Sequence, residues 1–375
     1  MRYYVIVGEA SGDLHGSNLL KELAKLDPSS EFRCWGGDMM QAAGAKLVKH
    51  YRELAFMGFV EVLLNLRTIF KNLAFCKKDI AEYKPDAIIL IDYPGFNLRI
   101  AEWAKQQGYK VIYYISPQVW AWKENRVKKM KECIDKMLVI LPFEKEYYKN
   151  KWNWDVEYVG HPLVEVVDNF LASVSHQANS VGENGKKTIA LLPGSRKQEI
   201  LKKLPVMLEL SSFYPEYQFI VAKAPGQEDA FYQSMLAPYN NVEAVANQTY
   251  ALLTQSTAAL VTSGTATLET ALFGVPEVVC YKGSAISYQI AKRIISIKYI
   301  SLVNLIMDKP VVTELIQNDM NVENLRRELD MLLNDEARKN QLKEDYSKLK
   351  KLLSEGGMAS ANAAKSIAAF MTSVS

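Results

Sequence analysis

Short β-rich runs alternate with helical segments along most of the chain, and this alternation limits the fold more than any other feature. Such alternation is typical of parallel sheets whose strands are joined by crossover helices. In the first half we expect helices at 12–26 and about 59–83, and strands at 3–7, 32–35, 86–91, 111–115, 137–140 and 156–159. In the second half we expect strands at 188–192, 218–221, 242–245, 258–261 and 277–280.

A segment rich in Ser, Asn and Gly, 171–187, breaks both periodicities and reads as a linker or loop. A chain of 375 residues suits two cores better than one. We therefore expect an α/β protein with two tandem Rossmann-like domains and a ligand cleft between them, at the carboxyl ends of the strands. The expected parts are 1–170, 187–345, and C-terminal helices at 346–375 that pack back on the first domain. The chain from residue 311 onward reads as helical.

Charge and composition exclude several classes of protein. A net charge of +3 argues against a dedicated nucleic-acid binder. The cysteines, at 34, 76, 133 and 280, form no C-x-x-C pair, which favours reduced core thiols. No D-x-D motif occurs, so we expect no metal–diphosphate site. We also expect no cofactor, and the Gly-rich turn at 8–16 lacks the G-x-G-x-x-G pattern of nicotinamide binding. No apolar run approaches the roughly 20 residues of a membrane span, so we expect a cytoplasmic protein.

Unusual turns follow three strands of the first half: GEASGDLHG (8–16), DYPGFN (92–97) and SPQVWAW (116–122). The first opens a helix, whose backbone amides could bind an anion, or it is a tight turn with Asp13 as an early helix charge. Asp92 could be a general base on a sugar hydroxyl, or an Asp that closes a turn. Trp120 and Trp122 could pack on sugars or acyl chains, or belong to the core.

The turn PGSR (193–196) in the second half has features of a phosphate site. Gly194 permits close backbone approach, the Ser195 amide and hydroxyl can donate hydrogen bonds, and Arg196 can clamp phosphate. The alternative is a plain helix start with a surface Arg.

A matching turn is SGTATLE (263–269). We expect Ser263 as the helix N-cap, with the amides of Gly264 and Thr265 directed at a diphosphate. The Glu269 carboxylate could accept hydrogen bonds from ribose hydroxyls, or it could be an ordinary charge on a helix surface.

Two segments could contact a membrane. Residues 54–78 are heavily apolar with scattered Lys and Arg, as in an interfacial helix, and a buried crossover helix would look the same. Residues 123–136, KENRVKKMKECIDK, are mostly basic. They form either a solvated helix face or one attracted to anionic lipid headgroups.

Taken together, the motifs resemble the lipid-A-disaccharide synthase family. The resemblance extends from residue 7 to about 306 and rests on VGEASGDLHG, ELAFMGFVEVL, KPDAIILIDYPGFN, YYISPQVWAW, LPFEKEYY, VGHP, LLPGSR, SGTATLE, VVCYKG and YISLVNLI. It implies a B-type glycosyltransferase fold and a metal-independent, inverting transfer. The implied donor is UDP-2,3-diacylglucosamine, the acceptor is 2,3-diacylglucosamine 1-phosphate, and the products are the β-1,6-linked lipid A disaccharide 1-phosphate and UDP.

The resemblance also implies roles for single residues. Asp92 matches the family's proposed base, and Arg196 a residue needed on the donor side. Nucleotide binding is implied for 263–269 and Asn304. The acceptor side is implied to include Glu9, Ser11, Gly12, Asp13, Ser116, Gln118 and Trp120. Relatives often carry a second acidic residue three positions after the base, where this chain has Gly95.

Two rival functions fit the same scaffold: a UDP-sugar 2-epimerase, which needs no acceptor, and a non-catalytic UDP-sugar-binding protein. Family members work at the cytoplasmic face of the inner membrane, which favours peripheral contact through residues 54–78. The oligomeric state is open, and a homodimer is one possibility.

Overall fold

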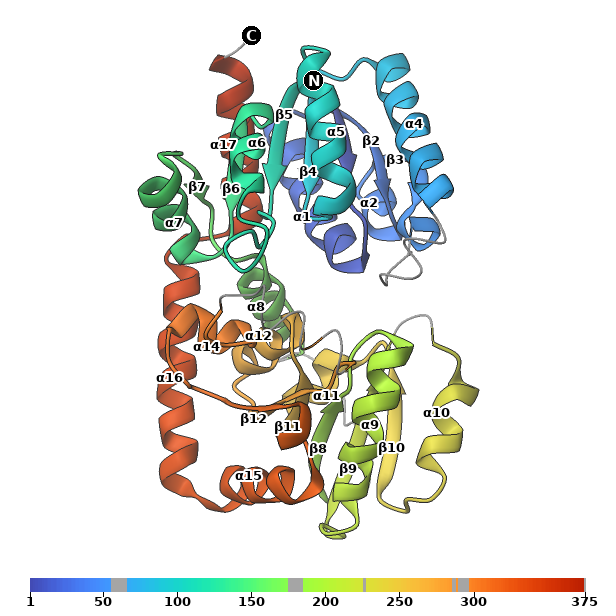
Figure 1. The fold of residues 1–375 in the computed structure, drawn as a ribbon, viewed down its shortest axis with the longest axis vertical. Coiled ribbons are helices and arrows are strands. Elements are labelled where there is room, and N and C mark those ends of the chain that lie inside the picture. The colour runs from blue at the N-terminus through green and yellow to red at the C-terminus, as the bar shows by residue number, and fades with distance from the viewer. Residues whose placement is uncertain (55–65, 175–184, 225–226, 285–287, 289–296, 374–375) are drawn as a thin grey trace. The chain divides into compact units, whose positions relative to one another are not determined.

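The computed structural model describes residues 1–54, 66–174, 185–224, 227–284, 288 and 297–373. The chain forms two compact units (Figure 1). The first unit is Met1–Pro162 together with Leu353–Ser375, and the second is Leu163–Leu352. The first unit is therefore discontinuous in sequence, because the chain leaves it at Pro162 and returns to it at Leu353.

The first unit is a parallel sheet with the strand order β3-β2-β1-β4-β5-β6-β7. Its strands are β1 (Arg2–Ile6), β2 (Glu31–Gly36), β3 (Lys46–His50), β4 (Ala87–Ile91), β5 (Lys110–Tyr114), β6 (Lys136–Val139) and β7 (Glu157–Tyr158). Its helices are α1 (Ala10–Leu26), α2 (Asp38–Ala42), the short 3-10 helix η1 (Tyr51–Leu54), α4 (Leu66–Tyr83), α5 (Pro94–Gln106), α6 (Arg126–Cys133), α7 (Pro142–Trp152) and α17 (Ala359–Ser373).

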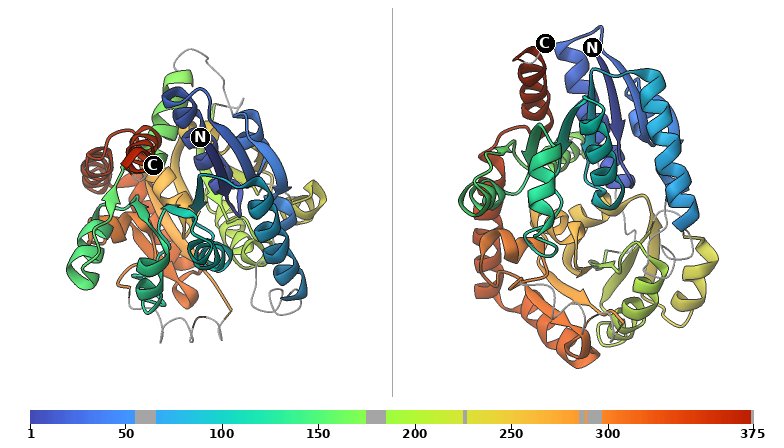
Figure 2. Two further views of the ribbon diagram at one scale, coloured as in Figure 1. Left: turned by 90° about the horizontal axis from the view of Figure 1, so that it is seen from above. Right: turned by 45° about the horizontal axis from the view of Figure 1, so that its top comes forward.

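Successive residues of the central strands enter different cores, since side chains alternate across a strand. In β1, Tyr4 and Ile6 join a cluster with Leu73 of α4 and Ile100 of α5. Tyr3 and Val5 join the cluster on the opposite face, which includes buried residues of α1 and α17. The last helix, α17, packs along α1 (Figure 2). Strands buried on both faces explain why these runs are almost wholly apolar.

The second unit has the strand order β10-β9-β8-β11-β12-β13, again with parallel pairing throughout the described strands. Its strands are β8 (Lys187–Leu192), β9 (Tyr217–Lys223), β10 (Val242–Ala246), β11 (Ser256–Thr262), β12 (Glu277–Tyr281) and β13 (Thr313–Ile316). Its helices are α8 (Pro162–Val174), α9 (Lys197–Ser211), α10 (Asp229–Leu236), α11 (Thr249–Gln255), α12 (Thr265–Leu272), α14 (Leu302–Met307), the 3-10 helix η2 (Gln317–Asp319), α15 (Val322–Asn334) and α16 (Glu336–Ser354).

The predicted fold class is confirmed: each unit is a Rossmann-like sheet with crossover helices. Two strands were not predicted, β3 and β13, and both lie at the edge of a sheet. The expectation of continuous helix from residue 311 is wrong at β13. The helix expected at 59–83 is present from Leu66, and 59–65 lie outside the described residues. The loop expected at 171–187 is helical to Val174, and 175–184 are outside the described residues.

Two passages of the chain meet within the first unit. Gly160 has a φ of +93°, and a Cβ there would lie 2.7 Å from the Gly357 carbonyl oxygen. A Cβ on Gly356 would lie 2.4 Å from the Gly160 Cα. The Tyr158 hydroxyl also donates a hydrogen bond to the Leu353 carbonyl at 3.2 Å. Only glycine permits two backbones to approach this closely, so the contact between the two passages depends on Gly160 and Gly356.

Candidate functional site

The predicted motifs follow the two central strands of each sheet. In the first unit, β1 pairs with β2 on one side and β4 on the other, so GEASGDLHG and DYPGFN begin at adjacent strand ends. In the second unit, β8 and β11 pair in the same way, and PGSR and SGTATLE follow them. This is the switch point of a doubly wound sheet, where crossovers diverge and ligands bind.

Asp92 follows β4 in an unusual backbone conformation. Asp92 and Tyr93 have φ values of +44° and +50°, and Ile115, after the neighbouring β5, has +64°. Positive φ is uncommon for any residue with a side chain and exceptional for a β-branched one. Such conformations persist where surrounding contacts enforce them, and they gather at functional sites.

Three hydrogen bonds hold the Asp92 backbone. The Asn97 Nδ2 and the Tyr113 hydroxyl donate to its carbonyl oxygen at 2.7 and 2.6 Å. The Asp92 amide donates to the Tyr114 carbonyl at 3.2 Å. Asn97 is fully buried in α5, and Tyr113 lies in the core beside it. The direction of the Asp92 side chain is thus set by its backbone and by two neighbouring elements.

Burial raises the pKa of Asp92 to about 7, and the nearby charge of Glu9 adds to the shift. A carboxyl group with this pKa is present in both forms near neutral pH. It can take a proton from a hydroxyl more effectively than an ordinary aspartate, because catalytic bases work best with a pKa near the working pH.

Gly8 leaves room for the Tyr93 ring. A Cβ on Gly8 would lie 2.2 Å from Tyr93 Cγ, far inside contact distance. The ring also stacks on Phe96, with centroids 5.6 Å apart. The glycine at the end of the first strand therefore sets the position of the residue next to Asp92.

Asp13 has a structural role, because its side chain caps a helix. Its carboxylate accepts hydrogen bonds from the amides of Gly37, Met39 and Met40, at 2.7 to 3.1 Å, and so caps α2. Gly12 is buried where a Cβ would lie 2.9 Å from Val7 Cβ. These two residues hold α1 and α2 at the strand ends, and their acceptor-side assignment stays a prediction.

Of the predicted acceptor-side residues in this loop, Glu9 and Ser11 are partly exposed, whereas Gly12 and Asp13 are buried. The Ser11 hydroxyl donates to Glu9 Oε1 at 2.8 Å. Glu9 also interacts electrostatically with Asp92, so the ends of β1 and β4 place these two carboxylates near each other.

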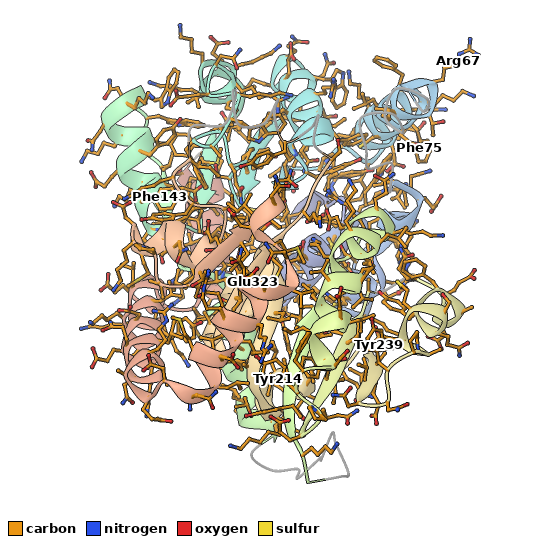
Figure 3. The ribbon with its side chains drawn as sticks, turned by 60° about the horizontal axis from the view of Figure 1, so that its bottom comes forward. Arg67, Phe75, Phe143, Tyr214, Tyr239 and Glu323 are labelled. Carbon is orange, nitrogen blue, oxygen red and sulfur yellow. The ribbon has the colours of Figure 1, made fainter. Side chains whose placement is uncertain are left out.

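The SPQVWAW turn follows β5. The Ser116 hydroxyl is buried and lies 2.7 Å from the Tyr148 hydroxyl, whereas Gln118 is exposed. Trp120 Nε1 donates to Glu144 Oε1 at 3.2 Å. The Trp120 ring packs edge-on against Phe143, which Figure 3 labels. Trp120 is thus partly core, and Gln118 is the polar side chain of this turn that remains accessible.

Glu144 was not predicted as part of the site. It is buried in α7, and it accepts a hydrogen bond from the Leu141 amide at 3.0 Å. Burial raises its pKa to about 7, with a smaller contribution from the charge of Asp92. Glu144 therefore holds Trp120 and is a buried carboxylate whose charge interacts with that of Asp92.

In the second unit, the PGSR turn is open. Gly194 has a φ of +112°, Ser195 is exposed, and Arg196 is the exposed N-cap of α9. Arg196 Nη1 lies 3.4 Å from Glu199 Oε1. An open helix start with an exposed guanidinium can bind a phosphate.

Lys203 connects the two turns of the second unit and was not predicted. Its side chain is buried in α9, and its ammonium group donates to the Thr262 hydroxyl at the end of β11. It also lies 3.8 Å from Glu199. Burial lowers the pKa of Lys203, while the Glu199 charge raises it. Lys203 therefore places a positive charge beneath both turns.

The SGTATLE turn differs in one detail from expectation: the N-cap of α12 is Gly264, not Ser263. Gly264 has a φ of +127°, and a Cβ there would meet no atom within 4 Å. Gly264 and Thr265 are exposed, so their backbone is accessible to a ligand. Glycine adopts this positive φ without strain, so the chain enters the helix at Gly264, one residue later than expected.

Glu269 is partly buried and accepts a hydrogen bond from the Tyr250 hydroxyl at 2.7 Å. Burial raises its pKa, and the Tyr250 bond opposes this. Tyr250 packs with Phe170 and Phe273. The carboxylate is therefore held in place by an aromatic cluster, which an ordinary surface glutamate would lack.

Asn304 is buried, and its side chain bonds other parts of the fold. Its Nδ2 donates to the Val312 carbonyl and to Glu314 Oε1, both at 2.9 Å, and its Oδ1 accepts from the Val312 amide at 2.9 Å. These bonds tie α14 to the start of β13. Its role in nucleotide binding stays a prediction.

Two further observations concern the described ranges alone. No group of three or more His, Cys, Asp or Glu residues there could hold a metal ion. No helix in the same ranges is long and apolar enough to cross a membrane.

Solved structures of the same fold define the class. The chain is similar to the UDP-GlcNAc 2-epimerase from Neisseria meningitidis, with a TM-score of 0.70, 13% identity and full coverage of both chains. It is also similar to the glycotransferase of kitacinnamycin, with a TM-score of 0.69, 14% identity and 99% of each chain covered. Two Rossmann-like units of this kind are the B-type glycosyltransferase fold.

Sequence relatives then identify the family. Residues 3–369 match the lipid-A-disaccharide synthetase family, and the chain belongs to it. The lipid-A-disaccharide synthase of Geobacter metallireducens is 40% identical over 361 residues, covering 95% of this chain and 94% of the relative. That of Nitrosococcus oceani is 38% identical, covering 94% and 92%.

Proposed function

We propose that this glycosyltransferase transfers 2,3-diacylglucosamine from UDP-2,3-diacylglucosamine to the 6-hydroxyl of 2,3-diacylglucosamine 1-phosphate. The products are the β-1,6-linked disaccharide 1-phosphate and UDP. Family membership supports transfer over epimerisation, because the likeness to a 2-epimerase at 13% identity concerns the fold alone.

Asp92 carries the proposal, since its backbone is held by Asn97 and Tyr113 and its pKa is raised to about 7. Asp92 takes the proton of the acceptor 6-hydroxyl while that oxygen bonds to the donor's anomeric carbon. The bond between this carbon and the diphosphate oxygen breaks, and its electron pair leaves with UDP. Attack from the face opposite UDP inverts the configuration.

The second unit stabilises the departing diphosphate. Arg196 and the exposed amides of Ser195, Gly264 and Thr265 face developing negative charge, and preorganised donors of this kind supply a few kcal/mol each in known enzymes. Lys203 adds a fixed positive charge below the same turns. Glu269, oriented by Tyr250, binds the ribose hydroxyls.

The test is a product assay with both acylated substrates in the presence of a chelator. The wild type should form disaccharide 1-phosphate and UDP. Asp92→Asn should lower turnover by about 10²- to 10⁴-fold, since it removes a general base, and should leave UDP affinity unchanged. Asp155→Asn is the control, because Asp155 is an exposed carboxylate of the same unit. Turnover by Asp92→Asn at the wild-type rate excludes Asp92 as the base.

We also propose that part of residues 54–78 contacts the membrane surface. On α4, Phe70 and Phe75 are 61% and 47% exposed, and exposed Arg67, Lys71 and Lys78 flank them. Figure 3 shows Arg67 and Phe75 projecting from this helix. Apolar side chains bordered by cations suit the headgroup region of an anionic bilayer.

A vesicle experiment tests this contact. Phe70→Ser with Phe75→Ser should weaken binding to phosphatidylglycerol vesicles. Phe213→Ser is a matched control, because Phe213 of the second unit is also 47% exposed. Equal losses in both variants would contradict a specific role for α4.

A further inference from the structure

A positively charged pocket lies between α5 and α6 in the first unit. It has a volume of about 380 Å³, within the range of small-molecule sites, and Pro94, Gly95, Arg99, Glu102, Arg126 and Lys129 are among its lining residues. Pro94 and Gly95 belong to the turn that begins with Asp92. The proposed base and this pocket therefore share one segment of chain.

The pocket has more cations than anions. Lys129 pairs with Glu102 at 2.7 Å, which neutralises both. Within the described part of the chain, no carboxylate lies at ion-pair distance from Arg99, Arg126 or the adjacent Lys123. The remaining charge of the pocket is therefore positive.

The cations are held close enough to repel one another. Burial and the Arg99 charge lower the pKa of Arg126, and burial with the charges of Arg126 and Arg99 lowers the pKa of Lys123. Lys123 and Arg126 share one neighbour, because they lie 4.2 Å and 5.9 Å from the ring centroid of the exposed Trp122. An anion bound among them would relieve the repulsion.

An anion in this pocket must be bound by side chains, because the backbone amides at the start of α6 are already paired. The first amides of α6, those of Arg126 and Val127, already donate to the carbonyls of Lys123 and Glu124. Arg99 donates one bond to the Gly95 carbonyl and keeps other N–H donors available. Guanidinium groups of this kind favour phosphate esters, whose oxygens they can bind two at a time.

The pocket borders an apolar groove and is linked to Asp92 through the chain and through Tyr113. Arg99 and Glu102 also line a groove between α4 and α5, whose other walls include Phe70, Leu73 and Trp103. Arg126 interacts electrostatically with Tyr113, whose hydroxyl bonds the Asp92 carbonyl. An amphiphile could thus place its phosphate in the charged pocket and its apolar part in the neighbouring groove.

We propose that Arg99, Lys123 and Arg126 bind the phosphate monoester of the acceptor, so that this pocket holds the 1-phosphate of the same sugar whose 6-hydroxyl reaches Asp92. This inference rests on the proposed function. The carbons that carry the 1-phosphate and the 6-hydroxymethyl group flank the ring oxygen of the hexose, so cations that hold the phosphate would fix which hydroxyl reaches the base. A phospholipid headgroup has the same phosphate chemistry, and the experiment separates the two sources.

The test compares acceptors with and without the 1-phosphate. In Arg99→Ala and Arg126→Ala, KM for the phosphorylated acceptor should rise about 10- to 100-fold, as expected for a lost charged hydrogen bond. KM for 2,3-diacylglucosamine and for the donor should not change. Glucosamine 1-phosphate, which has no acyl chains, should compete with the acceptor in the wild type and about 10-fold less well in the variants. Lys128→Ala is the control, because Lys128 is exposed on α6 and does not line the pocket.

The outcomes are distinct. A wild type that forms no disaccharide overturns the proposed function and this inference with it. A wild type that forms disaccharide, while both Arg variants keep the preference for phosphorylated acceptor, overturns the pocket alone. The variants could instead keep the preference for phosphorylated acceptor but sediment less with phosphatidylglycerol vesicles and normally with phosphatidylcholine vesicles. That result assigns the cations to the bilayer and also overturns the proposed phosphate pocket. Because Arg99 is exposed, its variant should fold even if Arg126→Ala does not.

Discussion

The two sheets share one strand order, apart from the seventh strand of the first sheet, but their switch points are built differently. In the first unit, residues with side chains adopt positive φ there: Asp92, Tyr93 and, after β5, Ile115. In the second unit, the positive φ values at these strand ends belong to glycines, Gly194 and Gly264. The arrangement in the first unit fixes the direction of the Asp92 side chain. The arrangement in the second unit leaves the backbone at Gly194 and Gly264 free of side-chain cover.

This difference suits different chemistry. The base proposed at Asp92 must point in one direction, and bonds from Asn97 and Tyr113 hold its unfavourable backbone conformation in place. A diphosphate needs several donors at close range, and glycine permits that approach without strain. We therefore expect first-unit variants to affect turnover and second-unit variants to affect UDP binding.

Gly8→Ala should give the largest effect. The new methyl group would lie 2.2 Å from the Tyr93 ring and displace the residue beside Asp92. Turnover should fall at least about 100-fold, since misplacing a reacting group by about 1 Å can cost that much. UDP affinity should stay at the wild-type value.

Gly44→Ala is the control for a glycine lost away from the site, because alanine is strained at its φ of +97° but a Cβ there would meet no atom within 4 Å. It should lower stability without lowering turnover. A similar loss of turnover in both variants would mean that Gly8 has no special role at the site.

Gly264→Ala should have the next largest effect. Alanine disfavours a φ of +127°, so the backbone should rotate and turn the Gly264 and Thr265 amides away from the diphosphate. UDP affinity, measured calorimetrically, should fall about 10-fold. Gly274→Ala, at φ +75° near the opposite end of α12, carries comparable strain and should bind UDP normally. Equal losses would assign the effect to folding.

The pH profile sharpens the comparison further. A base must be ionised, so kcat/KM should rise as pH increases through about 7, the pKa of Asp92. The Glu9 charge contributes to that pKa, so Glu9→Gln should move the midpoint down by roughly half a unit to one unit. Glu22→Gln, farther along α1, should leave the midpoint in place. An upward shift in Glu9→Gln would contradict the assigned interaction.

The smallest effect should come from the N-terminal end of a strand in the second sheet, away from the strand ends that carry the predicted motifs. Glu277 starts β12, is buried, and has its pKa raised well above the usual value by burial. Its contribution to stability is full below the unfolded pKa of about 4.5 and is lost as pH rises, because the unfolded chain releases the proton more easily.

Glu277→Gln removes this pH dependence. At pH 8 its Tm should exceed that of the wild type by about 2–4 °C, with the difference shrinking towards pH 5. Turnover should not change. A lower Tm at pH 8 would show that the carboxyl makes a contact the amide cannot replace.

Much of the fold could be predicted from sequence because the central strands are buried on both faces. Runs such as Ala87–Ile91 are almost wholly apolar, and their ends locate Asp92 and Gly264. Two of the edge strands, β3 and β13, were missed, and they contain Lys46, Lys49, Thr313 and Glu314, whereas the edge strands β7 and β10 were predicted. One side of an edge strand lacks a pairing partner, so its sequence is more polar and its pattern weaker.

The supporting residues could not be predicted, because their partners come from distant parts of the chain. Lys203 reads as an ordinary helix lysine until Thr262 lies beside it. Tyr113 reads as a core aromatic, and its bond to Asp92 depends on the pairing of β4 with β5. Asn97 lay within a recognised motif, which was the one available signal for its role.

The discontinuity of the first unit has a consequence for how the protein is made. Ribosomes release the chain from the N-terminus, so the second unit can fold before α17 emerges. Until then, α1 packs on one face of the first sheet, but the part of that face that Ala363, Ile367 and Met371 later cover lacks its helix. We expect a nascent chain paused before residue 353 to bind chaperones through that face, and to release them once the last helix docks on α1.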